Sequence, residues 1–236
     1  MHLKKIRLKS ELFPTRERYP FNLGIFRNGL EIEFTRPVTF LMGENGTGKS
    51  TLLESLANRA GIHIWRDDSR THYEYNPLER QLYRAVELEW ADGPVPGSFF
   101  SAGIFQTFVT NLDEWAATDP GQLNYFGGKS LRTQSHGQSL MSYFRNRYKI
   151  RGLYFLDEPE TALSPKSQIE LLQILTETSR SGRAQFITAT HSPILTACPD
   201  AAIYSFDHGR VRKTTYEDTE HFRLYKAFMT DPGQFV

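Results

Sequence analysis

The alternation of apolar and polar residues along the chain predicts a protein of mixed helices and strands. Three short apolar runs, at residues 37–42, 152–156 and 184–190, have the length and composition of buried strands. Residues 50–57 and 165–181 carry apolar side chains at helical spacing, with Gly61 and Gly182 as plausible helix ends. The pattern therefore predicts an α/β fold.

The N-terminal part has a different pattern. Residues 3–8 alternate apolar and basic side chains, as expected of a strand with one buried face. Asn28-Gly29 is a turn signal between apolar stretches at 23–26 and 30–34. We therefore expect antiparallel strands within residues 1–42, and a further strand at residues 83–90.

The middle and the end of the chain complete the prediction. Residues 101–150 have helical character, with one helix opening near residue 134 and running to about Tyr148. A hairpin joins 203–206 to 211–215, and an amphipathic helix follows at 217–229. We expect one domain over residues 1–236, with an inserted antiparallel and helical lobe at about 62–150.

Composition narrows the class of protein only slightly. Hydrophobic residues make up 39% and charged residues 23% of the chain, and the formal net charge is +1. Bulk charge thus neither indicates nor excludes a nucleic-acid partner. Cys198 is the single cysteine, so no intrachain disulfide can form, and no apolar run has the length of a membrane span. These features, and an N-terminus without a signal-peptide core, predict a cytoplasmic protein.

The strongest chemical signal lies between the strand at 37–42 and the following helix. The segment fits G-x-x-x-x-G-K-[ST], a phosphate-binding loop whose backbone N–H groups and helix N-terminus hold a polyphosphate. Lys49 would reach the β- and γ-phosphates, and Ser50 would ligate Mg²⁺. The expected nucleotide-binding residues here are Gly43, Glu44, Asn45, Gly46, Thr47, Gly48, Lys49, Ser50 and Thr51. Upstream, Tyr19 or Phe21 could stack on an adenine ring, although aromatic residues packed on the sheet are an equal alternative.

Two carboxylates end the apolar run at 152–156. Asp157 stands where a P-loop ATPase places a carboxylate that holds Mg²⁺, and Glu158 could polarise the attacking water. A simple strand-ending turn is the alternative. His191, just after the run at 184–190, could sense the γ-phosphate or could make only a structural hydrogen bond.

A second anion site is predicted at the start of the helix near residue 134. Ser135, Gly137 and Gln138 offer a hydroxyl and free backbone N–H groups at a helix N-terminus. We interpret this site as one for the γ-phosphate bound by a partner subunit, with a plain N-cap at Ser135 as the alternative.

In this order, these motifs resemble the ABC-type ATPase head. Residues 43–50 look like Walker A, 134–138 like the signature motif, 153–158 like Walker B with its catalytic glutamate, 161–164 like the D-loop, and His191 like the switch histidine. The chain is also similar to small stand-alone bacterial AAA/ABC-like ATPases related to SMC and RecF heads. The resemblance implies a P-loop fold with a mainly parallel core sheet and a helical signature subdomain. It also implies ATP and Mg²⁺ as ligands, and a homodimer that closes around ATP.

The sequence departs from this family at several positions. His136 replaces a signature glycine and Ser164 replaces the D-loop aspartate, while Gln106 is a weak match for the metal-binding Q-loop residue. A kinase or G protein would leave the signature-like element unexplained. Two further functions stay open besides the stand-alone ATPase: a transporter's nucleotide-binding subunit, and a module for DNA repair or defence with a DNA or protein client. The DNA alternative depends on a basic cluster, which consists of Arg145, Arg147, Lys149 and Arg151.

Overall fold

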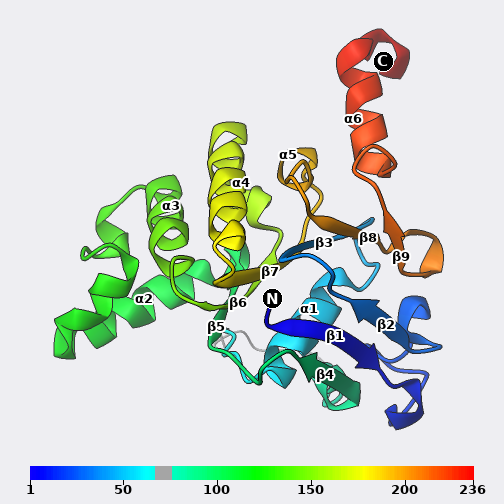
Figure 1. Cartoon of the computed structure of the whole chain (residues 1–236), viewed down its shortest axis with the longest axis horizontal. Helices are drawn as coiled ribbons and strands as arrows, with labels where there is room; N and C mark the ends of the chain where they lie inside the picture. The colour runs from blue at the N-terminus through cyan, green and yellow to red at the C-terminus, as the bar shows by residue number, and fades with distance from the viewer. Residues whose placement is uncertain (67–75) are drawn as a thin grey trace.

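A six-stranded sheet forms the centre of the molecule (Figure 1). The computed structural model describes residues 1–66 and 76–236. The strand order is β5-β6-β7-β3-β8-β9, and every neighbouring pair is parallel except β8 and β9. The strands are β3 (Val38–Met42), β5 (Gly97–Ser101), β6 (Gly152–Asp157), β7 (Ala184–Ala189), β8 (Ala202–Ser205) and β9 (Arg212–Thr214). The expected α/β fold with a mainly parallel core sheet is confirmed.

A smaller antiparallel sheet contains the N-terminus. Its order is β2 (Leu30–Glu33), β1 (Leu3–Leu8) and β4 (Val86–Trp90). Ile6 lies opposite Ile32 on one side and Leu88 on the other, which places apolar side chains on one face. The predicted N-terminal antiparallel strands are confirmed in this sheet.

One predicted strand of this region is wrong. Residues 23–26 contain a short 3-10 helix, Gly24–Phe26, in which Ile25 and Phe26 are both buried. Two consecutive buried side chains do not fit the alternation of a strand with one wet face. These residues pack beneath the phosphate-binding loop, since a Cβ added at Gly48 would lie 3.1 Å from Phe26 and 3.3 Å from Ile25.

The described residues form six α-helices: α1 (Lys49–Arg59), α2 (Ala102–Thr118), α3 (His136–Arg147), α4 (Pro165–Arg180), α5 (Pro193–Thr196) and α6 (Glu220–Thr230). The buried face of α1 joins the apolar cluster of the antiparallel sheet, whereas α2, α3 and α4 pack in a second cluster on the core sheet. Ser164 caps α4 by accepting a hydrogen bond from the Ser167 backbone, and Pro165 occupies the first turn, where its missing N–H costs no hydrogen bond.

The stretch at 62–150 contributes strands to both sheets. β4 pairs with β1, and β5 pairs in parallel with β6, so that Ser101 lies opposite Asp157. The predicted strand at 83–90 begins only at Val86, because residues 82–85 form a 3-10 helix. The remainder of the stretch includes α2 and α3, which lie together at one end of the core sheet (Figure 1).

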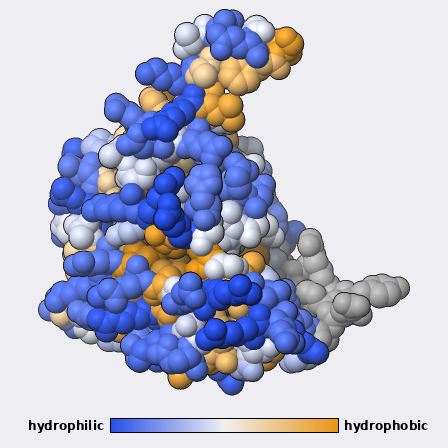
Figure 2. Space-filling view, turned by 90° about the vertical axis from the view of Figure 1, so that its right-hand side faces the viewer, coloured by the Kyte–Doolittle hydropathy of each residue, from blue (hydrophilic) through white to orange (hydrophobic). Residues whose placement is uncertain are grey.

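Helix α6 projects away from the rest of the molecule. Figure 2 shows it as an arm with apolar surface along one side. Its apolar residues Leu224, Tyr225, Phe228 and Met229 are all exposed, and Met229 retains 78% of its surface. In the described part of the chain, no helix is both long enough and apolar enough to cross a membrane.

Candidate active site

The phosphate-binding loop connects β3 to α1 and depends on glycine at two close approaches. Gly43 and Gly48 have φ angles of 140° and 98°, a region that glycine adopts without steric cost. A Cβ at Gly43 would lie 2.8 Å from Asp207 Oδ1. The same carboxylate accepts a hydrogen bond of 3.1 Å from the backbone N–H of Glu44. The hairpin of β8 and β9 therefore supports the loop from behind.

Lys49 lies inside this loop. Its side chain is only 3% exposed, and Nζ donates to the carbonyl oxygens of Gly43 at 2.6 Å and Glu44 at 2.9 Å. Burial lowers the pKa of Lys49, and the carboxylates of Glu158 and Asp157 oppose this effect. The loop thus places one ammonium group between the phosphate cradle and the two carboxylates that the sequence predicted.

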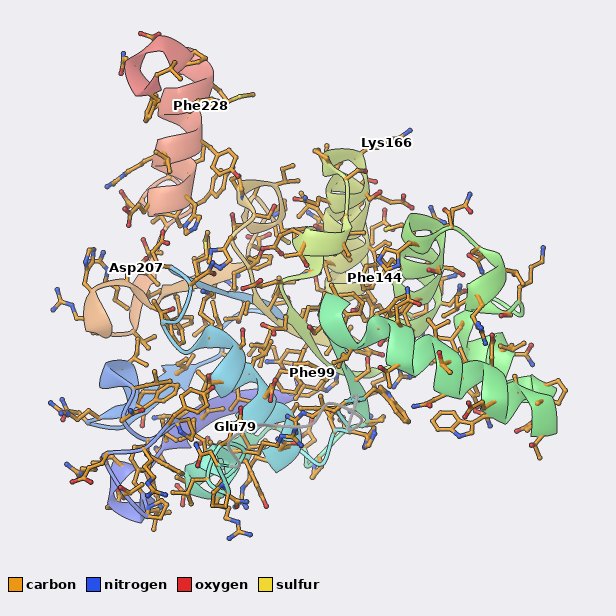
Figure 3. All side chains as sticks on the ribbon, turned by 180° about the vertical axis from the view of Figure 1, so that it is seen from behind. Glu79, Phe99, Phe144, Lys166, Asp207 and Phe228 are labelled. Atoms are coloured by element: carbon orange, nitrogen blue, oxygen red, sulfur yellow. The ribbon has the colours of Figure 1, made fainter. Side chains whose placement is uncertain are left out.

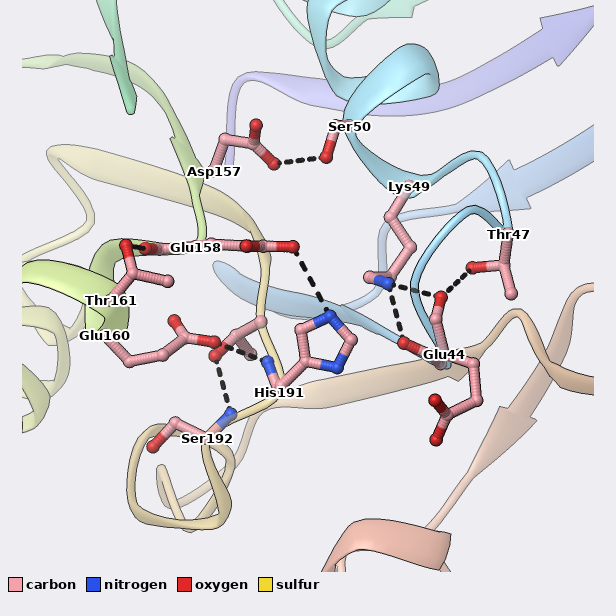
Figure 4. Close-up of polar contacts among 12 residues, drawn as sticks. Glu44, Thr47, Lys49, Ser50, Asp157, Glu158, Glu160, Thr161, His191 and Ser192 are labelled. Carbon is pink, nitrogen blue, oxygen red and sulfur yellow. Dashed lines mark hydrogen bonds and ion pairs between the residues drawn. The ribbon is translucent and has the colours of Figure 1, made fainter. Parts of the chain in front are cut away.

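Ser50 and Asp157 converge from different elements (Figure 4). Ser50 Oγ, in the first turn of α1, donates to Asp157 Oδ1 at the end of β6 over 2.8 Å. Burial raises the pKa of Asp157 to about 7, although the hydrogen bond from Ser50 lowers it. A divalent cation would compensate a buried carboxylate of this kind.

The donor set suits Mg²⁺ rather than a metal held by protein alone. Mg²⁺ prefers oxygen ligands and usually takes one or two carboxylates together with substrate phosphates. Within residues 1–66 and 76–236, no cluster of three or more histidine, cysteine or acidic side chains could hold a metal unaided. A hydroxyl and a carboxylate beside a phosphate-binding loop therefore fit a Mg²⁺–nucleotide complex.

Glu158 follows Asp157 with a left-handed backbone, φ 45° and ψ 54°. Its Oε1 lies 3.3 Å from His191 Nε2, and the Coulomb attraction of Glu158 acts to raise the pKa of His191 (Figure 4). The net pKa of His191 is nevertheless lowered, first by burial and then by Lys49. The structure therefore places Glu158, His191 and Lys49 at the same edge of the core sheet.

Sequence reasoning missed two residues that contact His191. Glu160 Oε1 accepts a hydrogen bond of 2.5 Å from the backbone N–H of His191, and burial raises the pKa of Glu160. His221 Nε2, in the first turn of α6, lies 3.1 Å from His191 Nδ1. No local spacing indicates these contacts, because the partners are 31 and 30 residues from His191.

The signature-like element begins helix α3. Ser135 Oγ accepts from the Gln138 backbone at 3.4 Å, and Gln138 Oε1 accepts from the Ser135 backbone at 3.1 Å. These two hydrogen bonds form a capping box, so Ser135 is an N-cap, which was the alternative expected from the sequence. The side chain of Ser135 is exposed at the start of the helix. At Gly137, an added Cβ would meet no atom within 4 Å. The first turn of α3 is therefore capped by its own side chains but accessible from outside, which suits an anion that replaces the cap.

Gln106, the candidate metal ligand, contacts this same element. Its Nε2 lies 2.9 Å from His136 Nδ1. Among the hydrogen bonds of the described residues, none joins Gln106 to Ser50 or Asp157. Its role at the metal stays a prediction that this geometry does not support. Ser101, at the end of β5, is the residue in register with Asp157.

The alternatives for adenine stacking differ in exposure. Phe21 is 1% exposed and packs edge-on against Phe13 at a ring distance of 4.9 Å, so it belongs to the core. Tyr19 is 39% exposed, and its hydroxyl lies 2.9 Å from Thr51 Oγ1 beside the phosphate-binding loop. Exposure and position favour Tyr19 as the stacking candidate.

The phosphate-binding loop before α1 and helix α3 lie in different parts of the molecule. Figure 3, seen from behind, places Phe144 of α3 well apart from Asp207, the residue that contacts the phosphate-binding loop. In Figure 1, α3 and α1 are likewise separated, with β6 between them. One copy of the chain therefore presents a phosphate-binding loop and an open helix N-terminus as two separate surfaces.

The fold and the arrangement of this site resemble those of P-loop ATPases of the ABC and SMC-head kind. A family model described as "AAA domain, putative AbiEii toxin, Type IV TA system" matches residues 138–197. A second model, described as an AAA domain, matches residues 21–58. Together the two matches include the phosphate-binding loop, both carboxylates and His191.

Similar proteins include a transporter subunit and two solved ATPase domains. The ferric enterobactin transport ATP-binding protein FepC of Escherichia coli (strain K12) is 29% identical over 60% of this chain and 58% of its own length. The chain thus spans little more than half of that relative. An SMC head bound to the C-winged helix domain of ScpA superposes with a TM-score of 0.53, at 13% identity, over 91% of this chain and 98% of that chain. A dimeric ATP-binding cassette bound to ADP and Pi superposes with a TM-score of 0.50, at 14% identity, over 92% of this chain and 99% of that chain.

Proposed function

We propose that this protein hydrolyses ATP as a homodimer in which each ATP lies between the phosphate-binding loop of one copy and helix α3 of the other. The observation that carries the proposal is the convergence of Lys49, Ser50, Asp157, Glu158 and His191 at the C-terminal edge of the core sheet. Ligands of open α/β sheets bind at this edge. The separate, open helix N-terminus supplies a second half-site that suits a partner's nucleotide.

Within one copy, the residues divide the work of phosphoryl transfer. The backbone N–H groups of residues 43–51 and the ammonium of Lys49 hold the phosphates. Ser50 and Asp157 supply oxygen ligands for Mg²⁺, which neutralises charge on the phosphates when it is bound. Glu158 accepts a hydrogen bond from the attacking water and orients it, and His191 donates a hydrogen bond to the γ-phosphate.

The partner copy completes the pocket. Ser135 and the backbone N–H groups of Gly137 and Gln138 stand at the N-terminus of a helix whose dipole favours negative charge. Contact with a partner's γ-phosphate would bind the two copies only while the triphosphate is intact. Hydrolysis would therefore open the dimer and reset it.

The test replaces Glu158 by glutamine, which keeps the shape of the side chain but removes its negative charge. We expect Glu158→Gln to bind ATP normally, to lose ATP turnover by about 100-fold or more, and to accumulate as a dimer in ATP. Turnover is measured by phosphate release and mass by light scattering after gel filtration. Glu177→Gln, at an exposed position of α4, is the matched control.

Two results would end this proposal. Full hydrolysis by the Glu158→Gln protein would remove Glu158 from the mechanism. A wild-type protein that stays monomeric at saturating ATP while hydrolysing at its full rate would remove the shared pocket.

The client of the ATPase is a second question. The basic cluster expected to bind DNA is partly engaged within the chain: Arg145 pairs with Glu170, and Arg147 donates to the Gly97 carbonyl at 2.8 Å. A role in DNA repair or defence predicts that DNA stimulates hydrolysis, with binding that weakens steeply as salt rises. Absence of both effects would leave a protein client.

A transporter subunit is the alternative that the similarity to FepC favours. It predicts co-purification with a membrane protein after mild detergent extraction. A stand-alone ATPase predicts that the protein is recovered without such a partner.

A further inference from the structure

The segment between β9 and α6 is held firmly beside the active site. Tyr216 Oη donates to the carbonyl of Pro193 at 3.0 Å, just beyond His191. Thr219 is 5% exposed, donates to the Tyr216 carbonyl at 2.7 Å and caps α6 by accepting from the Phe222 N–H. These contacts fix the first turn of α6, although the rest of the helix projects away.

This first turn places one imidazole against another. His221 Nε2 lies 3.1 Å from His191 Nδ1, and the two ring centres are 5.2 Å apart. On the other side of the His191 ring, Nε2 lies 3.3 Å from Glu158 Oε1. The three side chains form a row from α6 to the catalytic glutamate.

The carboxylate of Glu158 limits where the protons of His191 and His221 can lie. An ionised carboxylate attracts an N–H and repels a lone pair, so the 3.3 Å contact with Glu158 favours the proton of a neutral His191 on Nε2. His191 Nδ1 then carries a lone pair and needs a donor. His221 Nε2 is the atom at hydrogen-bond distance from it, and it can donate when it carries a proton.

We propose that His221 is a positioning residue that fixes His191 in its Nε2–H tautomer, so that His191 presents a donor to the γ-phosphate. This inference rests on the role given to His191 in the proposed function. The role requires His221 to carry a proton on Nε2, from which it donates to His191 Nδ1. Among the described residues, His191 Nε2 has an electrostatic contact with Glu158 but no hydrogen bond, so a proton on Nε2 can be donated to another acceptor.

The surroundings of His191 favour the neutral ring that the argument needs. Burial and the nearby Lys49 lower the pKa of His191, although Glu158 opposes them. A neutral imidazole has two tautomers, and the choice between them is set by the partner of the other nitrogen. His221 therefore contributes orientation and tautomer, while the group that touches the phosphate is His191.

Two substitutions of His221 distinguish the effect of its N–H donor from the effect of its ring size. His221→Phe keeps a ring but removes the donor, and we expect kcat to fall about tenfold with little change in KM, the scale of one lost hydrogen bond in the transition state. His221→Gln keeps an N–H donor, and we expect it to recover most of kcat. His63→Phe, at an exposed position, is the matched control and leaves kcat unchanged.

The tautomer itself is measured by nitrogen-15 NMR of histidine-labelled full-length protein without nucleotide. The His191 signals are assigned by comparison with His191→Gln. We expect the Nε2–H tautomer in the wild type and in His221→Gln, and a mixture of tautomers in His221→Phe. Equal loss of kcat in both His221 variants, or an Nδ1–H tautomer in the wild type, would overturn the inference.

This measurement is independent of the proposed function. If His191→Gln hydrolyses ATP at the wild-type rate, the role of His191 in turnover fails. The NMR spectra would still decide whether His221 sets the tautomer of His191.

Discussion

The backbone of Glu158 provides a direct test of strain at the catalytic edge. Its φ of 45° is in the left-handed region, which costs a residue with a Cβ roughly 1–2 kcal/mol. The following Pro159 adds a preference for extended backbone at this position. The conformation is held by the Glu158 N–H, which donates to the Ala189 carbonyl at 2.9 Å, and by the Thr161 hydroxyl, which donates to the Glu158 carbonyl at 2.8 Å.

Comparing Glu158→Gly with Glu158→Ala isolates this strain, because both variants lose the same carboxylate. Glycine removes roughly 1–2 kcal/mol of steric cost but loses about 0.5–1 kcal/mol more conformational entropy on folding than alanine. We therefore expect the glycine variant to have the higher free energy of unfolding, by about 0.5–1 kcal/mol. At exposed Glu177, near the C-terminal end of α4, the order reverses, and the alanine variant has the higher free energy of unfolding by about 1 kcal/mol.

The assay is reversible urea unfolding, followed by circular dichroism, on all four variants without nucleotide. Equal slopes of the free energy against urea concentration show that the unfolded states are comparable. If the Glu158→Gly protein has a lower free energy of unfolding than the Glu158→Ala protein, by the same difference as between the two Glu177 variants, the backbone of Glu158 is not strained and the reasoning is refuted.

Two further predictions concern the frame of the site. The side chain of Gln185 is fully buried. Its Oε1 accepts hydrogen bonds of 2.8 Å from the backbone N–H groups of His2 and Leu3, and its Nε2 donates to the Leu3 carbonyl at 2.9 Å. Gln185→Leu leaves these three groups unpaired and should lower the free energy of unfolding by about 3–6 kcal/mol in urea titrations, whereas exposed Gln173→Leu should change it by less than about 0.5 kcal/mol. Ser50→Ala should raise the Mg²⁺ concentration for half-maximal hydrolysis about tenfold, as expected for one lost ligand, while Ser55→Ala in the same helix should leave it unchanged.

The parts of the site that follow a strand directly could be predicted from the sequence. The apolar run before Asp157 is buried on both faces of the sheet, and the phosphate-binding loop must lie between a strand and a helix. Local pattern and chemical motif therefore gave the same position for Lys49, Ser50 and Asp157. The ends of neighbouring parallel strands meet at one edge, so the proximity of His191 follows from the same pattern.

Other features depend on contacts between distant segments and left no local signal. Strand β5 has only Phe99 and Phe100 as an apolar core, and its position follows from pairing with β6. Residues 23–26 have the composition of a strand but pack both Ile25 and Phe26 inward under the phosphate-binding loop. The contact of His221 with His191 joins residues 30 positions apart, and its position follows from the path of the hairpin that precedes it.

The loops after β6 and β7 are connected to each other by several contacts at this edge of the sheet. Three contacts join them: the Glu158 N–H to the Ala189 carbonyl, the His191 N–H to Glu160, and the His191 ring to the Glu158 carboxylate. A strained backbone persists only where its surroundings hold it, and these contacts supply that support at Glu158. In the proposed function, displacement of the His191 ring by a γ-phosphate would therefore act on the backbone of Glu158. Because His221 contacts the other side of the same ring, the displacement would also act on the first turn of α6, which is the part of that helix anchored to the body.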